Sequence, residues 1–227
     1  MYFKSVTFDL DGTLLDTIAD LAEGCRLMLD EIGAPPRTPA EVHSFVGKGM
    51  AVLIERCLTH GGQPPSAARL DAAIASFRAH YTAVNGRFTR VYPGVIEGLD
   101  AWQASGLKMG IVTNKPAEFT EALIDHVGMR SYFEVIVSGD TTPHKKPHPE
   151  PILHACRLLG VDPRFNLHIG DSKNDIDAAR AAGCAAYAVP YGYNEGEPVD
   201  SADYDALVSD LLVAYQQALT FKDLLHK

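Results

Sequence analysis

The spacing of apolar residues changes soon after the chain begins. Residues 3–9 are rich in aromatic and β-branched side chains and end at a glycine-containing turn, which predicts a strand. From Thr17 to Gly33 the apolar residues recur at the spacing of an amphipathic helix. Residues 70–84 repeat this helical spacing, and no strong strand candidate lies between about 17 and 87. This stretch is therefore expected to be an all-helical unit.

A further helix start lies inside this unit, at residues 38–41. Thr38 is suited to cap the helix, and Pro39 is suited to its first position. Glu41 stands at the spacing from Thr38 at which the two side chains form a capping box. We therefore expect a helix to begin here.

Beyond the helical unit, strand-like and helix-like segments alternate along the chain. The expected strands are residues 107–113, 134–138, 166–171 and 185–189. The expected helices are residues 95–105, 116–127, 149–160, 174–183 and 205–219. Apolar strands that alternate with helices are typical of a parallel sheet covered on both faces.

The alternation and the helical unit together predict an α/β protein. Its core is expected to be a Rossmann-like, doubly wound parallel sheet, with an all-helical domain inserted after the first strand. The core comprises residues 1–15 and 88–227. The inserted domain, called the cap from here on, comprises residues 16–87.

The charge of the chain limits its partners. The 227 residues carry a formal net charge of −9, so nucleic acid and anionic membrane surfaces are poor partners. An anionic substrate would need a local positive centre to overcome this background. No apolar run approaches the roughly 20 residues that span a membrane.

The cysteines and the first residues favour a cytoplasmic protein. Cys25, Cys57, Cys156 and Cys184 are scattered along the chain and form no CxxC pair. We interpret them as reduced core residues rather than metal ligands. The first residues, MYFKSVTFD, reach an acidic side chain too soon for a secretory signal.

Polar residues gather where the expected strands end. In an open α/β sheet, ligands bind at the carboxyl ends of the strands. The polar residues at or just after these ends are Asp9, Asp11, Thr113, Asn114, Lys145, Lys146, Asp171 and Asp175. We therefore expect these segments to bring carboxylates, hydroxyl and amide groups and one ammonium to a single site.

The residue types at this site narrow the chemistry. Several carboxylates cannot share a site in ionised form unless a cation compensates them, and hard oxygen ligands beside a phosphate suit Mg²⁺. Lysine, threonine and asparagine side chains are donors that suit phosphate oxygens. Because the chain has no P-loop and no Ser–His pair, a carboxylate that forms an aspartyl-phosphate is the best candidate nucleophile.

Four short motifs follow one another along the chain: DLDGT, TN, KP and GDSKND. In this order they resemble the four motifs of the haloacid dehalogenase superfamily, and the helical insertion resembles the inserted cap of that superfamily. The stretches KKPHPEP, GDSKNDIDAARAAG and YGYNEGE resemble its bacterial phosphoglycolate phosphatases. The resemblance covers nearly the whole chain.

The resemblance implies catalytic and metal-binding roles for the aspartates. Asp9 would be the nucleophile, and Asp11 would be first the general acid and then the general base. Mg²⁺ would be held by Asp9, the backbone carbonyl of Asp11 and Asp171. Asp175 would support the metal shell.

The resemblance also implies roles for the neighbouring motif residues. Thr113 and Asn114 would hold the phosphoryl group, and Lys146 would neutralise its charge. Gly12 would allow the turn after the first motif, and Thr13 would be a helper near the site.

Other polar residues near the motifs are expected to have ordinary structural places. Asp16 is expected to cap, or add charge to, the first turn of the helix that starts near Thr17. Lys145, His144 and His148 are expected to be solvated, whereas His168 alternates with apolar strand residues and is expected to pack inside.

A lysine of the cap is the candidate for substrate specificity. Residues 46–50, VGKGM, place Lys48 between two glycines. A turn between helices explains this stretch equally well. As a functional loop, it would close on the site and pair Lys48 with a carboxylate of the substrate, as 2-phosphoglycolate would require.

The leading hypothesis is a Mg²⁺-dependent phosphomonoesterase that converts 2-phosphoglycolate to glycolate and phosphate through an aspartyl-phosphate. The alternatives are a phosphatase for another small metabolite such as a sugar phosphate, and a phosphomutase. In the phosphonate hydrolases of the superfamily that the chain resembles, the position of Asp11 is typically not an aspartate, so Asp11 argues against that reaction. A phospho-aspartate signalling module is the non-enzyme alternative, but its motif order and length differ. The expected partner is a small phosphorylated metabolite, and the oligomeric state is left open.

Overall fold

A parallel sheet forms the centre of the core in the computed structural model, which describes residues 2–59, 62–199 and 202–224. Within the described residues the sheet has six strands in the order β5-β4-β1-β6-β7-β8. The strands are β1 (Ser5–Phe8), β4 (Lys108–Val112), β5 (Val135–Val137), β6 (Asn166–Gly170), β7 (Ala185–Ala188) and β8 (Ala206–Leu207). All neighbouring strands are parallel, as the sequence predicted.

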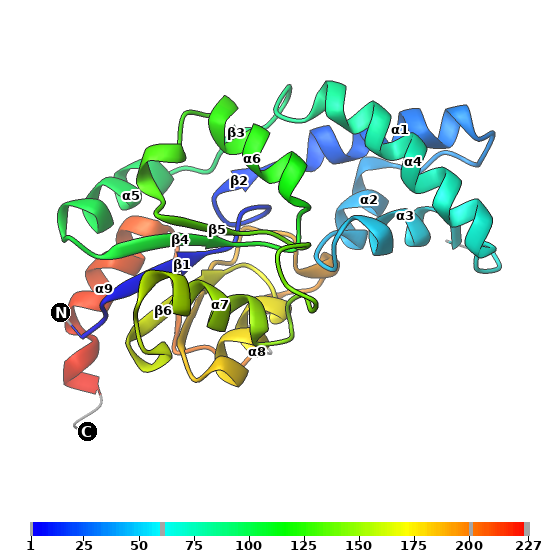
Figure 1. Cartoon of the computed structure of the whole chain (residues 1–227). Helices are drawn as coiled ribbons and strands as arrows, with labels where there is room; N and C mark the ends of the chain where they lie inside the picture. Colours follow the sequence, from blue (N-terminus) through cyan, green and yellow to red (C-terminus); the bar gives the residue numbers. More distant parts are fainter. Residues whose placement is uncertain (1, 60–61, 200–201, 225–227) are drawn as a thin grey trace.

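Helices cover both faces of this sheet (Figure 1). The helices of the core are α5 (Val95–Ala104), α6 (Ala117–His126), α7 (Glu150–Leu159), α8 (Lys173–Ala182) and α9 (Leu211–Leu224). Apolar residues of α5, α6 and α9 share one buried cluster with β1 and β4, and those of α7 and α8 share another with β5 and β7. The doubly wound architecture expected from the alternating segments is thereby confirmed.

The alternation of side chains along β1 shows why its residues form a central strand. Val6 and Phe8 are fully buried in the apolar cluster on one face. The hydroxyl of Thr7 lies 3.0 Å from Nδ1 of His168 in the neighbouring strand. His168 is fully buried, as its alternation with apolar residues predicted. Polar side chains in the sheet therefore bond to one another across neighbouring strands.

Four helices follow β1 and form a separate unit beyond the carboxyl ends of the strands (Figure 1). They are α1 (Ile18–Glu31), α2 (Pro39–Phe45), α3 (Met50–Thr59) and α4 (Ala67–Val84). Their apolar faces form a third buried cluster, to which Phe119 of α6 and Tyr193 of the loop after β7 also belong. The capping box predicted for α2 is present: Thr38 Oγ1 accepts from Glu41 N, and Glu41 accepts from Thr38 N.

Hydrogen bonds fix the start of α1 and its connection to the end of the unit. Asp16 Oδ1 accepts from Ile18 N at 3.2 Å, which agrees with its expected place at the helix start. Asp20 is fully buried and accepts from the backbone N–H groups of Gly86 and Phe88, at 3.0 and 2.7 Å. This carboxylate therefore ties α1 to the segment that returns to the core.

Several short elements did not follow from the apolar pattern. β2 (Leu15–Asp16) and β3 (Arg90–Val91) form a two-stranded antiparallel sheet where the chain leaves and re-enters the core. The expected helix 205–219 is wrong at its start, because residues 206–207 form β8 and the helix begins at Leu211. Strands of two residues are too short to show any periodicity.

In the described part of the chain, the remaining elements are three short 3₁₀-helices: Arg130–Tyr132, Pro163–Phe165 and Asn194–Gly196. The last of them lies in the glycine-containing loop after β7. Among the described helices, none is both long enough and apolar enough to cross a membrane.

Candidate active site

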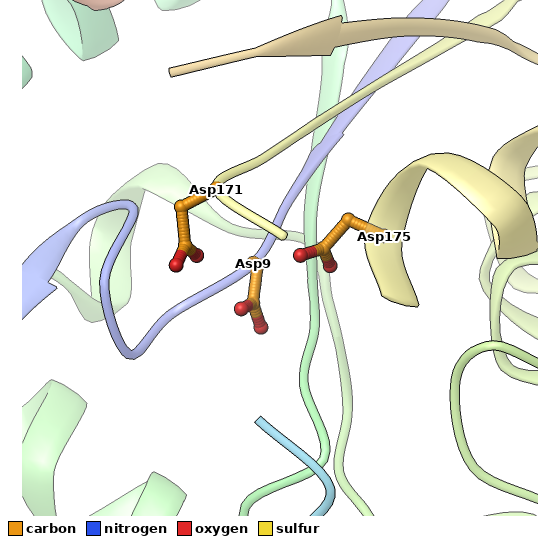
Figure 2. A group of neighbouring side chains, drawn as sticks. All are labelled: Asp9, Asp171 and Asp175. Carbon is orange, nitrogen blue, oxygen red and sulfur yellow. The ribbon is translucent and has the colours of Figure 1, made fainter. Parts of the chain in front are cut away.

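Three buried carboxylates meet at the carboxyl end of the sheet (Figure 2). Asp9 directly follows β1, Asp171 directly follows β6, and Asp175 lies in the first turn of α8. One oxygen from each of the three lies within 4.8 Å of the others, a spacing that could hold a metal ion. The sequence-based expectation that these strand ends converge is met by the geometry.

Lys146 lies between two of these carboxylates. Its Nζ is 2.8 Å from Asp9 Oδ1 and 2.5 Å from Asp175 Oδ1, and it also donates to the carbonyl of Val112. The lysine side chain is only 2% exposed. A buried ammonium is stable only where opposite charges and acceptors surround it, so this lysine forms part of the charge balance of the site.

One lysine does not compensate all three carboxylates. Burial raises the pKa of Asp9 well above its usual value, and the charges of Asp175 and Asp171 add to this effect. Burial, with the charge of Asp175, raises the pKa of Asp171 to about 6. Burial acts against ionisation of Asp175 as well, but Lys146 and His168 outweigh it and hold its pKa below the usual range. The cluster therefore needs a further cation to hold every carboxylate ionised near neutral pH.

Backbone and hydroxyl donors fix the orientation of Asp171. Its Oδ1 accepts from Thr13 Oγ1 at 2.9 Å, and its Oδ2 accepts from the backbone N–H of Tyr193 at 2.7 Å. Gly12 passes so close that a Cβ there would lie 2.6 Å from Asp171 Oδ2, and its φ is +94°. The glycine of the first motif is thus required both for the turn and for the approach of Asp171.

Asp11 follows Asp9 by two residues, and its side chain is 14% exposed. Its Oδ1 accepts from Thr17 Oγ1 at 2.7 Å and lies 3.2 Å from Nζ of Lys115. Asp11 is thus about as exposed as Asp9, whose side chain is 13% exposed, and it is held by groups outside the carboxylate cluster.

Thr113 and Asn114 directly follow β4 next to the carboxylates, and both are buried. The Asn114 amide accepts from the backbone N–H of Lys146 at 2.9 Å and donates to the carbonyl of Gly47 at 3.0 Å. Thr113 Oγ1 accepts from the N–H of Lys115 at 3.2 Å. In this structure the asparagine thus positions the loop of Lys146 and touches the helical unit.

A cavity opens from the carboxylates toward the helical unit, with a volume of about 60 Å³. Its polar lining residues are Asp9, Asp11, Thr113, Asn114, Lys115, Lys146, Ser172, Asn174 and Asp175. Its larger apolar and aromatic lining residues are Leu21, Val46, Met50, Leu53, Phe77, Tyr81 and Phe119. Both the sheet and the helical unit therefore contribute to the same small cavity.

Comparison with known proteins decides the family. The family model of the haloacid dehalogenase-like hydrolases matches residues 6–189, which contain every residue of the carboxylate cluster. The chain belongs to this family. The resemblance based on the four motifs is confirmed by this match, and the match covers both the sheet and the helical unit.

Relatives of this hydrolase cover almost its whole length. The phosphoglycolate phosphatase of Thiobacillus denitrificans is 47% identical over 212 residues, covering 93% of both chains. The phosphoglycolate phosphatase of Escherichia coli K12 is 37% identical over 231 residues, covering 93% of this chain and 92% of its own. A crystal structure from Haemophilus somnus, described as a predicted phosphoglycolate phosphatase, superposes with a TM-score of 0.90 at 31% identity, covering 96% of this chain and 99% of the other.

Lys48 lies apart from the cavity of this hydrolase. The lysine is 44% exposed, and its Nζ lies 3.3 Å from Oε2 of Glu195 in the loop after β7. The neighbouring residues Gly47 and Gly49 line the cavity, but Lys48 is not among the lining residues that the structure describes. The structure therefore brings the glycine loop to the site without its lysine, and the role of Lys48 stays a prediction. Lys145, His144 and His148 are exposed, as expected.

Two residues of the hydrolase site were missed from the sequence. Lys115 is 3% exposed and faces Asp11, and its Nζ donates to Tyr81 OH of α4 at 2.7 Å. Burial would lower the pKa of Lys115, but the carboxylate of Asp11 and the hydroxyl of Tyr81 outweigh it and raise that pKa above its usual value. Its position directly after the TN motif was a usable signal. Tyr81 had only its place on an apolar helix face, which also describes a core residue.

Proposed function

We propose that the protein is a phosphomonoesterase that hydrolyses 2-phosphoglycolate to glycolate and phosphate. The observation that carries this proposal is the placement of Asp9 beside the buried Lys146, with Asp11 lining the same cavity of about 60 Å³. The relatives named phosphoglycolate phosphatase, with up to 47% identity, support the same substrate.

The arrangement supports a reaction in two displacements. First, a carboxylate oxygen of Asp9 attacks phosphorus, the bond to the glycolate oxygen breaks, and Asp11 gives its proton to that oxygen. Next, Asp11 takes a proton from water, the water oxygen attacks phosphorus, and Asp9 and phosphate are released. Lys146 would balance the charge of the phosphoryl group, and Thr113 would donate to its oxygens.

We propose Mg²⁺ as the cofactor. Asp9, the backbone carbonyl of Asp11 and Asp171 would hold the ion, and Asp175 would support them. The carboxylates fit such an ion: Lys146, which contacts Asp9 Oδ1 at 2.8 Å, is shared with Asp175, and the pKa of Asp9 is raised well above its usual value. When bound, Mg²⁺ supplies positive charge to the carboxylates and to the phosphoryl oxygens.

Mg²⁺ is expected to raise the thermal unfolding temperature of the metal-free protein more at pH 8 than at pH 5. The pKa of Asp171 is raised to about 6, so its ionisation costs folding stability as the pH rises through that value. At pH 8 the ion offsets this cost, whereas at pH 5 it must displace a proton. An ion at 100 times its Kd stabilises by about 2.7 kcal/mol.

Differential scanning fluorimetry at both pH values, with EDTA-treated protein, measures this difference. An equal shift at both pH values would contradict the assignment of the ion to these carboxylates. Activity is expected to stop with EDTA, to return with Mg²⁺ and to return poorly with Ca²⁺, whose looser coordination shell misplaces the attacking carboxylate.

We also propose that residues 16–87 act as a cap on a core formed by residues 1–15 and 88–227. The apolar cluster that joins α1–α4 supports this division, as does the β2–β3 pair beside both proposed junctions. A cytoplasmic location is proposed as well, and four buried, free cysteines are compatible with a reducing compartment.

Phosphate release from a panel of small esters tests the proposed substrate. The panel contains 2-phosphoglycolate, sugar phosphates and an aryl phosphate, each assayed for kcat/KM with Mg²⁺. The highest kcat/KM is expected for 2-phosphoglycolate. A higher value for a sugar phosphate would favour the alternative phosphatase, and transfer of phosphate between hydroxyls without net release would favour a mutase.

A further inference from the structure

Lys115 is a buried charge that the two displacements leave without a task. Its side chain follows β4 and is 3% exposed, and it lines the cavity. Its Nζ lies 3.2 Å from Oδ1 and 3.4 Å from Oδ2 of Asp11. Burying an ammonium is costly, so its presence beside the proposed acid requires an explanation. Lys115 places a positive charge next to the point where the leaving oxygen receives its proton.

A tyrosine of α4 also contacts this ammonium. Lys115 Nζ donates to Tyr81 OH at 2.7 Å and lies 4.8 Å from the centre of the Tyr81 ring. The ring stacks on Phe77 and meets Phe119 edge-on, at centroid distances of 5.0 and 4.9 Å. These aromatic contacts fix the ring independently of its hydroxyl.

The geometry of the substrate directs its carboxylate to the same point. In 2-phosphoglycolate a single methylene group separates the leaving oxygen from the carboxylate. Asp11 must come within roughly 2.6–3.2 Å of the leaving oxygen to protonate it. The carboxylate therefore also lies near Asp11, where Lys115 provides a cation.

The other lysines near the cavity occupy different places. Among the lining residues that the structure describes, Lys146 is the other cation, and it lies between Asp9 and Asp175. Lys48 pairs with Glu195 outside the lining. The chain carries a net charge of −9, so an anionic substrate requires a local positive centre.

We propose that Lys115, oriented by Tyr81, binds the carboxylate of the substrate and determines the preference for 2-phosphoglycolate; this inference rests on the phosphatase function proposed above. Tyr81 belongs to the cap and Lys115 to the core. The carboxylate site is therefore complete only while the two units lie together, as they do in this structure. Substrate recognition is thereby linked to the closed arrangement that surrounds the aspartates.

The test compares 2-phosphoglycolate with its neutral amide, 2-phosphoglycolamide. The two esters share size and leaving-group structure but differ in the charge that Lys115 would read. The wild-type protein is expected to favour the acid in kcat/KM. Lys115→Met is expected to reduce this acid-to-amide ratio by about 10- to 150-fold, the worth of a charged hydrogen bond. Any disturbance of Asp11 affects both esters and cancels in the ratio.

Further variants keep the test decisive if Lys115→Met fails to fold. Lys115→Arg keeps the charge and is expected to retain more of the preference than Lys115→Met. Tyr81→Phe keeps the aromatic packing and is expected to lower the ratio by about 2- to 12-fold, the worth of a neutral hydrogen bond. Lys173→Ala removes an exposed lysine on α8 and is expected to leave the ratio unchanged.

The outcomes separate this inference from the proposed function. If the wild-type protein does not favour the acid, the proposed substrate is wrong. If it favours the acid and correctly folded Lys115 and Tyr81 variants keep the full preference, only the inference about Lys115 is overturned. A selective loss in Lys48→Ala, with none in the Lys115 variants, would assign the carboxylate to the lysine chosen from the sequence.

Discussion

Asp9→Asn is expected to abolish steady-state phosphate release, with a loss of about 10⁴-fold or more in kcat, as removal of a nucleophile causes in other enzymes. The asparagine keeps the shape of the side chain but removes the attacking charge. The fold is expected to remain intact, because burial already raises the pKa of Asp9 and makes its ionised form unfavourable. The thermal unfolding temperature of the metal-free variant near neutral pH should therefore equal or exceed that of the wild-type protein.

Two controls make this result interpretable. Mass spectrometry must show that the asparagine has not deamidated, since a small fraction of restored aspartate would mimic residual activity. Asp177→Asn serves as the matched substitution, because Asp177 is a partly exposed α8 residue that pairs with Lys173. Substantial turnover by verified Asp9→Asn protein would remove Asp9 as the nucleophile.

Asp11→Asn is expected to reduce kcat/KM for 2-phosphoglycolate by about 10²- to 10⁴-fold, the usual worth of general acid catalysis. An aryl phosphate with an activated leaving group needs less protonation and should lose less in the first displacement. Lys146→Ala, by contrast, should depress both substrates alike, because Lys146 balances charge at Asp9 and Asp175 rather than at the leaving group.

The comparison of the two substrates is the measurement that checks this role. Single-turnover rates for 2-phosphoglycolate and the aryl phosphate isolate the first displacement from the later attack of water. Equal losses for both leaving groups in Asp11→Asn would contradict its role as the acid. The side chain of Asp11 also pairs with Lys115, so a thermal unfolding measurement must accompany the rates.

The sequence predicted the sheet and most helices because their side chains repeat with a clear period. Residues 3–9 predicted β1, and the apolar spacing after Thr17 predicted α1. β8 has two residues, and no period can be recognised over that length. The helix predicted for residues 205–219 therefore included this short strand.

The core of the site could be predicted because parallel strands bring their carboxyl ends together. Asp9 and Asp171 converge for this reason, since β1 and β6 are neighbours in the sheet. Contacts between the helical unit and the rest of the chain depend instead on how α1–α4 pack against the core, which local periodicity does not encode. The pairing of Lys115 with Tyr81 and of Lys48 with Glu195 is of this second kind.

The most direct test of the account is to locate the phosphoryl group on the protein during turnover. Wild-type protein turning over 2-phosphoglycolate with Mg²⁺ is quenched in acid, digested and analysed by mass spectrometry. The account predicts a phosphorylated peptide modified at Asp9, and no such peptide from Asp9→Asn. Phosphate found on another residue of the active wild-type protein would contradict the assignment of Asp9 as the group that attacks phosphorus.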